Sequence, residues 1–261
     1  MNAGTGTPCC AAAATTSRSA WCESAITADI LRKVDEGTGR PMVDVILDTA
    51  EQKGTGKWAS QVALDLGVTA PTIAAAVFAR TMSAAKAERV AAAQVLAGPA
   101  AAAAPAAEAF VEKVRRALLA AKVCAYAQGF QLLRAADREH GWGLPFGTVA
   151  GVWSAGCIIR ARLLGDIRRA FADRADLPNL LLDAQFARVM AECQQDLREV
   201  VAVAAQHGAS VPAFMSSLAY YDGYRSARLP ADLLQAQRDY FGAHRYQRTD
   251  QPGSFHTRWI D

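Results

Sequence analysis

The sequence lacks several features that would direct it to a membrane, to export or to metal binding. It has no uninterrupted apolar run of about 20 residues, the length that a membrane-spanning helix requires. It does not begin with a basic segment followed by a short apolar core, so we expect no secretory signal. None of its six cysteines forms a Cys-x-x-C pair, and its histidines are isolated. We therefore expect a cytoplasmic protein without a metal site and without a membrane partner.

Charge of one sign is not massed anywhere in the chain either. The 28 Lys and Arg residues are interspersed with 25 Asp and Glu residues, which leaves a net charge of +3. This pattern argues against nucleic acid as a partner, because nucleic-acid binding requires clustered cations. At 52% hydrophobic and 20% charged residues, the composition is that of an ordinary globular protein. A small anionic metabolite would be a more suitable ligand for a chain with this small positive net charge.

Runs that alternate polar and apolar residues are almost absent, and apolar residues recur instead at helical spacing. Alanine dominates the apolar set and favours helix, because it loses no side-chain entropy on ordering. The expected helices are Ile26–Val34, Met42–Glu51, Trp58–Leu66 ended by Gly67, one capped by Thr69 and running to Leu96, Ala106–Glu139, Thr148–Phe171 with a break at Gly156, Asp183–His207, Pro212–Arg225 and Ala231–Tyr240. The sequence therefore predicts an all-α fold, a large helical bundle-like domain with an extended C-terminal tail.

A dinucleotide-binding unit is not expected. The fingerprint of such a unit is Gly-x-Gly-x-x-Gly between a β-strand and a helix. The sequence contains three Gly-x-Gly pairs, but each lacks the third glycine and none follows a strand-like run. We therefore expect no Rossmann domain, no cofactor-binding residue and no phosphate-binding P-loop in this chain.

The segment Gln52–Trp58 combines glycines with cations. Two glycines allow the backbone to turn tightly and to expose its N–H groups, two lysines add positive charge, and Thr55 adds a hydroxyl. A loop of this kind that leads into a helix suits a phosphate or another oxyanion. The alternative is a glycine cap between two helices, with Lys53 and Lys57 in solvent.

The segment Gln235–His244 offers a second group of anion-binding side chains. Arg238 carries a planar guanidinium that matches the oxygens of phosphate or carboxylate. His244 follows the expected helix end and could donate to the same anion. The alternative is an ordinary helix end at which Arg238 pairs with Asp239 or with solvent.

The sequence context of Arg80 and of Arg225 restricts what these two side chains can contact. Arg80 follows the apolar segment Ala74–Ala79, so its guanidinium must reach solvent, pair, or face a site. Arg225 lies three residues after Asp222, which favours an ion pair within one helix.

Three cysteines and two tryptophans are expected in the interior. Three cysteines lie in apolar stretches and are expected to be buried free thiols in a reducing compartment: Cys124, Cys157 and Cys193. Trp142 and Trp153 are expected in the core.

Seven ordered segments resemble the decarboxylating 6-phosphogluconate dehydrogenases. They are Ile46–Asp48, Lys53–Trp58, Ala76–Arg80, Tyr126–Phe130, Gly156–Arg160, Tyr220–Arg225 and Gln235–His244. They follow the order and spacing of that family from about Ile26 to the end of the chain, which makes a chance match implausible.

The resemblance implies an enzyme of the pentose phosphate pathway. Such enzymes use NADP to oxidise C3 of 6-phosphogluconate by hydride transfer, and then decarboxylate the product to ribulose 5-phosphate. It also implies that Lys53, Thr55 and Arg80 contact the substrate phosphate. The positions of Arg238 and His244 reach across the homodimer in this family and complete the partner subunit's site.

The resemblance further implies a division of the chain. Residues 1–25 are a loose segment outside the family match, residues 26–228 form the substrate-binding and dimerisation domain, and residues 229–261 form a helix and tail that reach the partner subunit. The family's Rossmann domain and its helix of catalytic residues match nothing in this chain, so we expect no catalytic residue here and no activity unless the missing half is supplied. The alternative is a non-catalytic helical module for dimerisation or phosphosugar binding.

Overall fold

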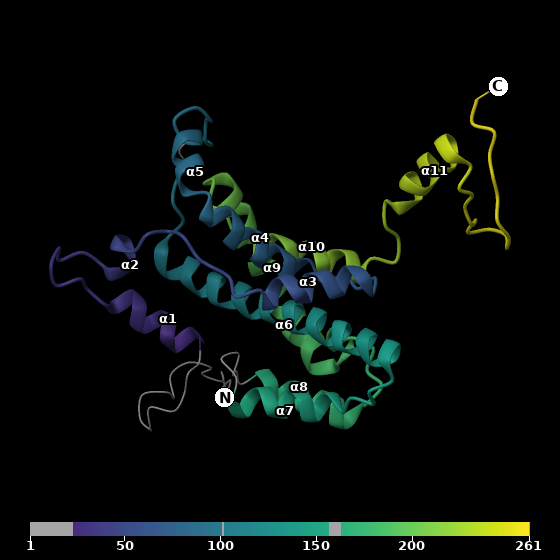
Figure 1. Ribbon diagram of the computed structural model, residues 1–261, viewed down its shortest axis with the longest axis horizontal. Coiled ribbons are helices and arrows are strands. Elements are labelled where there is room, and N and C mark those ends of the chain that lie inside the picture. The colour runs from purple at the N-terminus through teal and green to yellow at the C-terminus, as the bar shows by residue number, and fades with distance from the viewer. Residues whose placement is uncertain (1–22, 101, 157–162, 261) are drawn as a thin grey trace, which may run out of the picture.

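The computed structural model describes residues 23–100, 102–156 and 163–260 (Figure 1). Within these ranges the chain forms helices and no strand, which confirms the all-α prediction. The helices are α1 (Glu23–Arg32), α2 (Met42–Val45), α3 (Thr55–Asp65), α4 (Pro71–Ala84), α5 (Lys86–Ala92), α6 (Ala107–His140), α7 (Phe146–Gly156), α8 (Leu163–Asp173), the short 3-10 helix η1 (Leu180–Leu182), α9 (Ala184–Gln206), α10 (Pro212–Arg225) and α11 (Ala231–Gly242). Most of the expected loose N-terminal segment, and Cys157, lie outside the described residues.

Two expected helices are shorter in the structure. The helix expected over Met42–Glu51 ends at Val45, and Ile46 is already extended with a ψ of 133°. The helix expected to continue to Leu96 breaks after Ala84. The Ala85 N–H donates to the Met82 carbonyl at 3.2 Å, and the Arg89 guanidinium takes the Ser83 carbonyl at 3.0 Å, the acceptor that the next turn would use. Both differences depend on contacts with other segments rather than on local preference.

The core lies where α6 packs along α9, with α7 paired to α8 and α4 paired to α10 (Figure 1). Alanines and other small residues face α9 from α6, and they let the two helix axes approach closely. The side chains buried at this seam include Ala120, Val123, Ala127, Met190 and Leu197.

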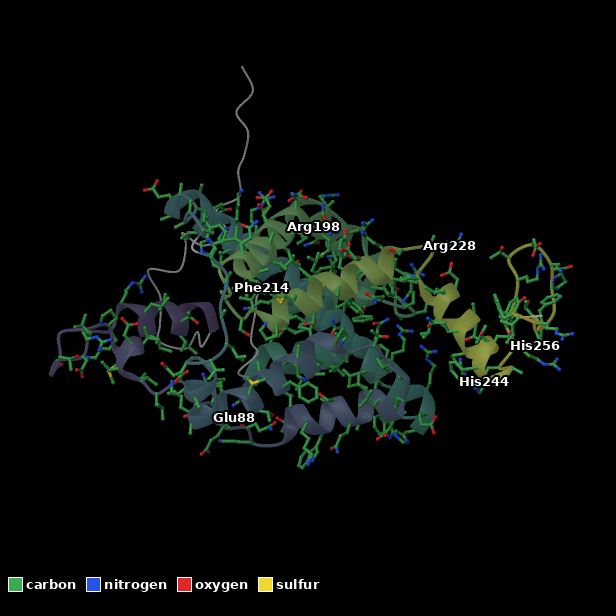
Figure 2. The ribbon with its side chains drawn as sticks, turned by 90° about the horizontal axis from the view of Figure 1, so that it is seen from above. Glu88, Arg198, Phe214, Arg228, His244 and His256 are labelled. Atoms are coloured by element: carbon green, nitrogen blue, oxygen red, sulfur yellow. The ribbon has the colours of Figure 1, made fainter. Side chains whose placement is uncertain are left out.

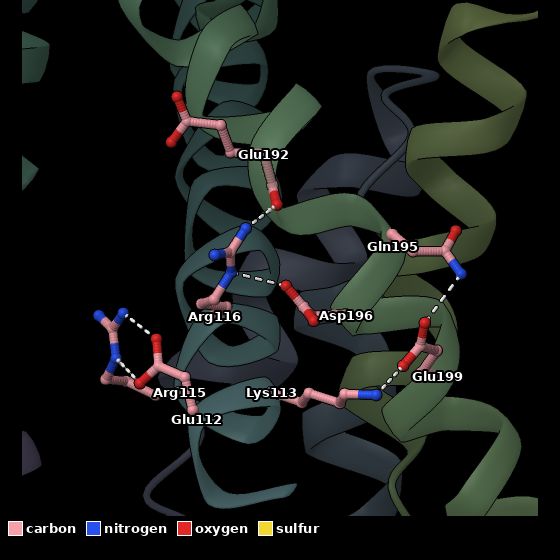
Figure 3. A network of polar contacts seen from close by, with 8 residues as sticks. All are labelled: Glu112, Lys113, Arg115, Arg116, Glu192, Gln195, Asp196 and Glu199. Carbon is pink, nitrogen blue, oxygen red and sulfur yellow. Dashed lines mark hydrogen bonds and ion pairs between the residues drawn. The ribbon is translucent and has the colours of Figure 1, made fainter. Parts of the chain in front are cut away.

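Polar side chains line the outer side of the same seam (Figure 3). The Arg116 Nε atom lies 2.6 Å from Asp196 Oδ2, and Gln195 Nε2 donates to Glu199 Oε1 at 3.1 Å. Lys113 also pairs with Glu199. These side chains are partly exposed, so each pair contributes little to stability and the buried contacts dominate.

The expectations for cysteines and tryptophans are met in part. Cys124 and Cys193 are buried free thiols, and burial raises the pKa of Cys124 to about 12. Trp153 is half-buried and lies 5.3 Å from the Phe130 ring. The core prediction for Trp142 is wrong, because its side chain is 57% exposed beyond the end of α6, where it stacks on His140.

The turns before α4 and α10 are alike. Each follows a glycine in the left-handed region, Gly67 with a φ of 63° and Gly208 with a φ of 65°, and this confirms the expected cap at Gly67. The helices then begin at a proline, preceded by Ala70 with φ/ψ of −126°/52° and by Val211 with −127°/55°. Thr69 is therefore not the cap of α4, and the helix starts without a capping side chain of its own.

A buried glutamine from α6 supplies the missing cap. Gln128 is fully buried; its Oε1 accepts the Thr72 N–H at 2.9 Å, and its Nε2 donates to Thr72 Oγ1 at 2.9 Å. The Thr72 hydroxyl also lies 3.0 Å from the Ser217 hydroxyl of α10, which donates to the Ala213 carbonyl at 2.7 Å. One polar network thus joins α4, α6 and α10 inside the apolar core.

The C-terminal part of the chain stands away from these helices (Figures 1 and 2). We call residues 229–260 the arm. The sequence predicted an extended tail here, and the structure adds that this tail folds back along α11. Tyr246 and Phe255 exchange two backbone hydrogen bonds of 2.9 and 2.8 Å, which close the return. In the described part of the chain, no helix is long and apolar enough to cross a bilayer.

Gln128→Leu is expected to lower the free energy of unfolding by about 1–3 kcal/mol, because the Thr72 N–H and hydroxyl would lose a partner in a site without water. Urea denaturation measures this, with Gln61→Leu on the exposed face of α3 as the control. Equal stability of the Gln128 and Gln61 variants would contradict the capping role.

Candidate functional site

The loop before α3 owes its shape to its two glycines. Gly54 adopts a φ of 94°, a region that L residues avoid, and its carbonyl accepts the Trp58 N–H at 2.9 Å as α3 begins at Thr55. A side chain on Gly56 would place its Cβ 2.8 Å from Val77 Cγ2 of α4. The first glycine therefore allows the turn, and the second allows α3 to approach α4 closely.

Residues 50–52 dock this loop onto α4. The Ala50 N–H donates to Ser83 Oγ at 2.9 Å, and the Arg80 guanidinium donates to the Glu51 carbonyl. Gln52 Nε2 donates to Thr81 Oγ1 at 3.4 Å. The structure thus brings Arg80 against the segment that carries Lys53 and Thr55, although these residues are 25 or more positions apart in the chain.

An acidic clamp holds the start of the same segment. Asp48 Oδ1 lies 2.5 Å from Lys86 Nζ, and Asp48 Oδ2 accepts from Arg89 Nη1 at 2.9 Å. Lys86 and then Arg89 lower the pKa of the Asp48 carboxyl from 3.8 to about 2. Sequence reasoning missed this clamp, because its partners lie on α5, at the break that the sequence did not predict.

The cations of the loop are not neutralised. Arg80 donates to a backbone carbonyl, and within the described part of the chain no carboxylate pairs with it, with Lys53 or with Lys57. Lys53 and Thr55 are exposed at the N-terminus of α3, where backbone N–H groups point outward. Positive charge, a hydroxyl and N–H donors therefore converge on a surface that can hold a phosphate.

Arg238 and His244 both lie on the arm. Arg238 Nη1 donates to Gln235 Oε1 at 3.0 Å and not to Asp239, which excludes the ion pair considered from the sequence. His244 is exposed just past the end of α11 (Figure 2) and lines a hollow of about 380 Å³ with Gln235 and Arg245. Within one chain the structure does not bring Arg238 and His244 beside Lys53, Thr55 and Arg80, because the arm projects away from α3 and α4 (Figure 1).

Asp239 is the main residue of the arm that sequence reasoning missed. It is fully buried and accepts hydrogen bonds from four donors in the tail. Burial would raise its pKa, but the bonds from the Thr257 N–H, His256 and Trp259 outweigh burial and lower it. The alternation of Phe255, Thr257 and Trp259 was the available signal, because residues two apart on an extended segment face the same side.

The expected pair of Asp222 and Arg225 is present at 3.1 Å, but it is secondary. Arg198 of α9 binds both oxygens of Asp222, with Nη1 at 2.8 Å from Oδ2. The ion pair of Arg198 and Asp222 joins α9 to α10, and it leaves neither Arg198 nor Asp222 available for a ligand.

A cleft of about 1040 Å³ between the ends of α3, α6 and α10 contains none of the five residues expected to bind substrate. Two of its polar groups bind each other: the Tyr220 hydroxyl donates to Gln131 Oε1 at 2.6 Å and accepts from Asn179 Nδ2 at 2.8 Å. Burial raises the pKa of Tyr220 to about 12. The loop before α3 is the stronger candidate because it brings Arg80 against the segment that carries Lys53 and Thr55. In the ranges described, no group of three or more His, Cys, Asp or Glu side chains could hold a metal.

Comparison with known proteins agrees with the resemblance. Residues 24–259 match the family described as 6-phosphogluconate dehydrogenase, C-terminal domain. The NADP(+)-dependent, decarboxylating 6-phosphogluconate dehydrogenase of Bacillus subtilis is 53% identical over 238 residues, which are 90% of this chain and 50% of that protein. The decarboxylating enzyme of Salmonella typhimurium is 56% identical over 236 residues, with the same coverage.

A solved structure agrees as well. The 6-phosphogluconate dehydrogenase of Plasmodium falciparum, described in its apo form and in complexes with NADP+ and with 6-phosphogluconate, matches with a TM-score of 0.84 and 39% identity. The match covers 90% of this chain and 50% of the Plasmodium chain. The chain therefore spans about half the length of the relatives it matches.

The acidic clamp predicts a pH-dependent stability. In the folded chain the pKa of Asp48 is lowered from 3.8 to about 2. The ion pairs of Asp48 therefore stabilise the folded state fully above about pH 4, and this stabilisation is lost as the pH falls through about 2. Asp48→Asn should therefore lower Tm at about pH 5 and match the wild type near pH 2. Thermal unfolding followed by circular dichroism measures both, with Asp44→Asn on α2 as the control. A Tm difference that persists at the lower pH would contradict the assignment.

Proposed function

The chain belongs to the 6-phosphogluconate dehydrogenase family, whose C-terminal domain it matches, and from this we propose that it forms the phosphate-binding side of a 6-phosphogluconate site. The reaction proposed for the whole assembly is the NADP-dependent oxidative decarboxylation of 6-phosphogluconate to ribulose 5-phosphate. This reaction belongs to the pentose phosphate pathway, so a cytoplasmic location is part of the proposal.

One observation carries the phosphate-binding role: Lys53, Lys57 and Arg80 lie on or against the loop that leads into α3, and none of them has a carboxylate partner in the described part of the chain. We assign Lys53 and Arg80 to the phosphate oxygens as charged donors, and Thr55 as a hydroxyl donor. A phosphate monoester carries nearly two negative charges at neutral pH. The charge of such a ligand and its many acceptor oxygens are complementary to this surface.

Arg238 and His244 are proposed to complete the site of a second copy of the chain. The arm holds them away from the loop of their own chain (Figure 1). Its apolar side chains are also uncovered, with Phe241 72% exposed and Leu233 65% exposed. On the body, Phe78 of α4 is 71% exposed close to Arg80. Uncovered apolar surface of this kind is typical of an interface, so we propose a homodimer in which the arm of one subunit (residues 229–261) lies on the body of the other (residues 26–228).

The described residues do not fit NADP. Such a cofactor is held by a strand, a glycine-rich turn and a helix, and the described ranges contain no strand. The hydride transfer is therefore assigned to no residue that the structure describes. What this chain's residues do is bind and orient the phosphate end of the substrate, which fixes the distance between that end and the reacting carbons.

Titration calorimetry with 6-phosphogluconate tests the phosphate-binding role. Lys53→Ala, Arg80→Ala and Arg238→Ala should each weaken binding by roughly tenfold or more, because each removes a charged hydrogen bond to phosphate. Lys33→Ala and Arg228→Ala are matched controls, since both side chains are exposed and pair with nearby acids.

Unchanged affinity in the Lys53 and Arg238 variants would refute the assignment. The same samples, supplied with NADP and with the NADP-binding half of a relative, separate the two hypotheses from the sequence. Turnover in that mixture fits a substrate-binding half, and binding without turnover fits a non-catalytic module. Turnover by this chain alone would contradict the expectation that it holds no catalytic residue.

A further inference from the structure

We propose that Asp239, Gln235 and Gly242 are positioning residues, which hold Arg238 and His244 in the orientation in which the arm presents them to a phosphate. This inference rests on the proposed function. None of the three residues is itself expected to touch the substrate.

Asp239 ties the tail to α11 through both carboxylate oxygens. Oδ1 accepts from the Arg245 N–H at 2.9 Å and lies 2.9 Å from His256 Nδ1, and Oδ2 accepts from the Thr257 N–H at 3.0 Å and from Trp259 Nε1 at 2.9 Å. The carboxylate is fully buried beneath the returning tail. It thereby holds the tail at the residue that directly follows His244.

Gln235 lies one turn earlier on α11 and contacts both Arg238 and the turn that carries His244. Its Oε1 accepts from Arg238 Nη1 at 3.0 Å, and its Nε2 donates to the Arg245 carbonyl. The N–H and the C=O of Arg245 are therefore both held by side chains of α11. One glutamine fixes the guanidinium of Arg238 relative to the turn that carries His244.

The turn itself needs such support, because its backbone is strained. Ala243 and Arg245, on either side of His244, have φ values of 48° and 61°. These are the non-glycine residues with positive φ in the described part of the chain, and side chains with a Cβ disfavour this region. Strain of this kind persists where surrounding contacts enforce it, and it is frequent at ligand-binding sites.

Gly242 fixes the imidazole ring. A Cβ at this position would lie 2.8 Å from both Cδ2 and Nε2 of His244. The ring therefore packs against the backbone at the end of α11, in space that only glycine leaves open. Gly242→Ala should push the ring out of this place without removing a hydrogen bond, and the glycine has no left-handed φ that an alanine would strain.

The first measurement follows the arm alone. In Asp239→Asn one carboxylate oxygen becomes an NH2 group, so whichever way the amide turns, at least one backbone N–H of the tail, that of Arg245 or that of Thr257, faces another donor. Hydrogen exchange of the 243–257 segment should then accelerate by roughly tenfold or more. Asp232→Asn, an exposed aspartate of α11 that pairs with Arg228, is the control and should leave this exchange unchanged. Unchanged exchange in Asp239→Asn would overturn its role in holding the tail.

The second measurement is 6-phosphogluconate affinity by calorimetry on the full chain. Gly242→Ala and Gln235→Ala should each weaken binding by roughly tenfold. Residues that act through one another are not additive, so Gly242→Ala should not weaken binding further in a His244→Ala background. Gln235→Ala should weaken it less than additively in an Arg238→Ala background. Gln237→Ala, an exposed glutamine on the same helix, is the control.

The outcomes separate the two proposals. If His244→Ala weakens binding but Gly242→Ala and Gln235→Ala do not, the positioning role is wrong and the phosphate site stands. The same conclusion follows if the effect of Gly242→Ala adds fully to that of His244→Ala and the effect of Gln235→Ala adds fully to that of Arg238→Ala. If the wild type does not bind and the exchange result is still obtained, the proposed function fails while the fold of the arm is confirmed.

Discussion

The N-terminus of α4 is the constraint on which the candidate site depends. A helix that begins without a capping side chain leaves backbone N–H groups to be satisfied by other means, and here Gln128 of α6 reaches into the core to accept from Thr72. That contact fixes α4 against α6 and α10. Because α4 carries Arg80 and the hydroxyls that receive residues 50–52, the place of the loop before α3 depends on a glutamine far from it in the chain.

In the arm, too, a buried polar side chain accepts backbone N–H groups and fixes the position of a segment. A buried polar side chain, Asp239, accepts N–H groups from a segment that has no regular ladder of its own. In both places the hydrogen bonds of a buried side chain fix the position of a segment, since leaving a buried partner unsatisfied would be costly. The body thus fixes one set of the proposed phosphate ligands, and the arm fixes the other.

Much of the fold could be predicted from the sequence, because helical spacing and alanine content act locally. The bounds of α6, α9 and α10 were predicted to within a residue or two. The end of α2 at Val45 and the break at Ala85 could not be, since they depend on Asp48, Ser83 and Arg89 meeting across the fold. The same limit applies to Trp142, whose exposure is set by where α6 ends.

The candidate site was predictable in its members but not in its geometry. Lys53, Thr55, Arg80, Arg238 and His244 came from residue chemistry joined to a family resemblance, and their roles remain proposals. Both sources singled out the segment Gln235–His244, but neither gave Gln235 or Gly242 a role, because their contacts form only when the tail returns along α11.

Mixing two defective subunits tests most directly whether a phosphate site is shared between copies of this chain. Lys53→Ala and His244→Ala subunits would be combined, allowed to exchange, and titrated with 6-phosphogluconate. If each site takes its loop from one subunit and its arm from the other, about a quarter of the sites should regain wild-type affinity, one in each mixed dimer. If no high-affinity site appears although mixed dimers form, the arm does not complete its partner's site, and the account of a shared phosphate site is contradicted.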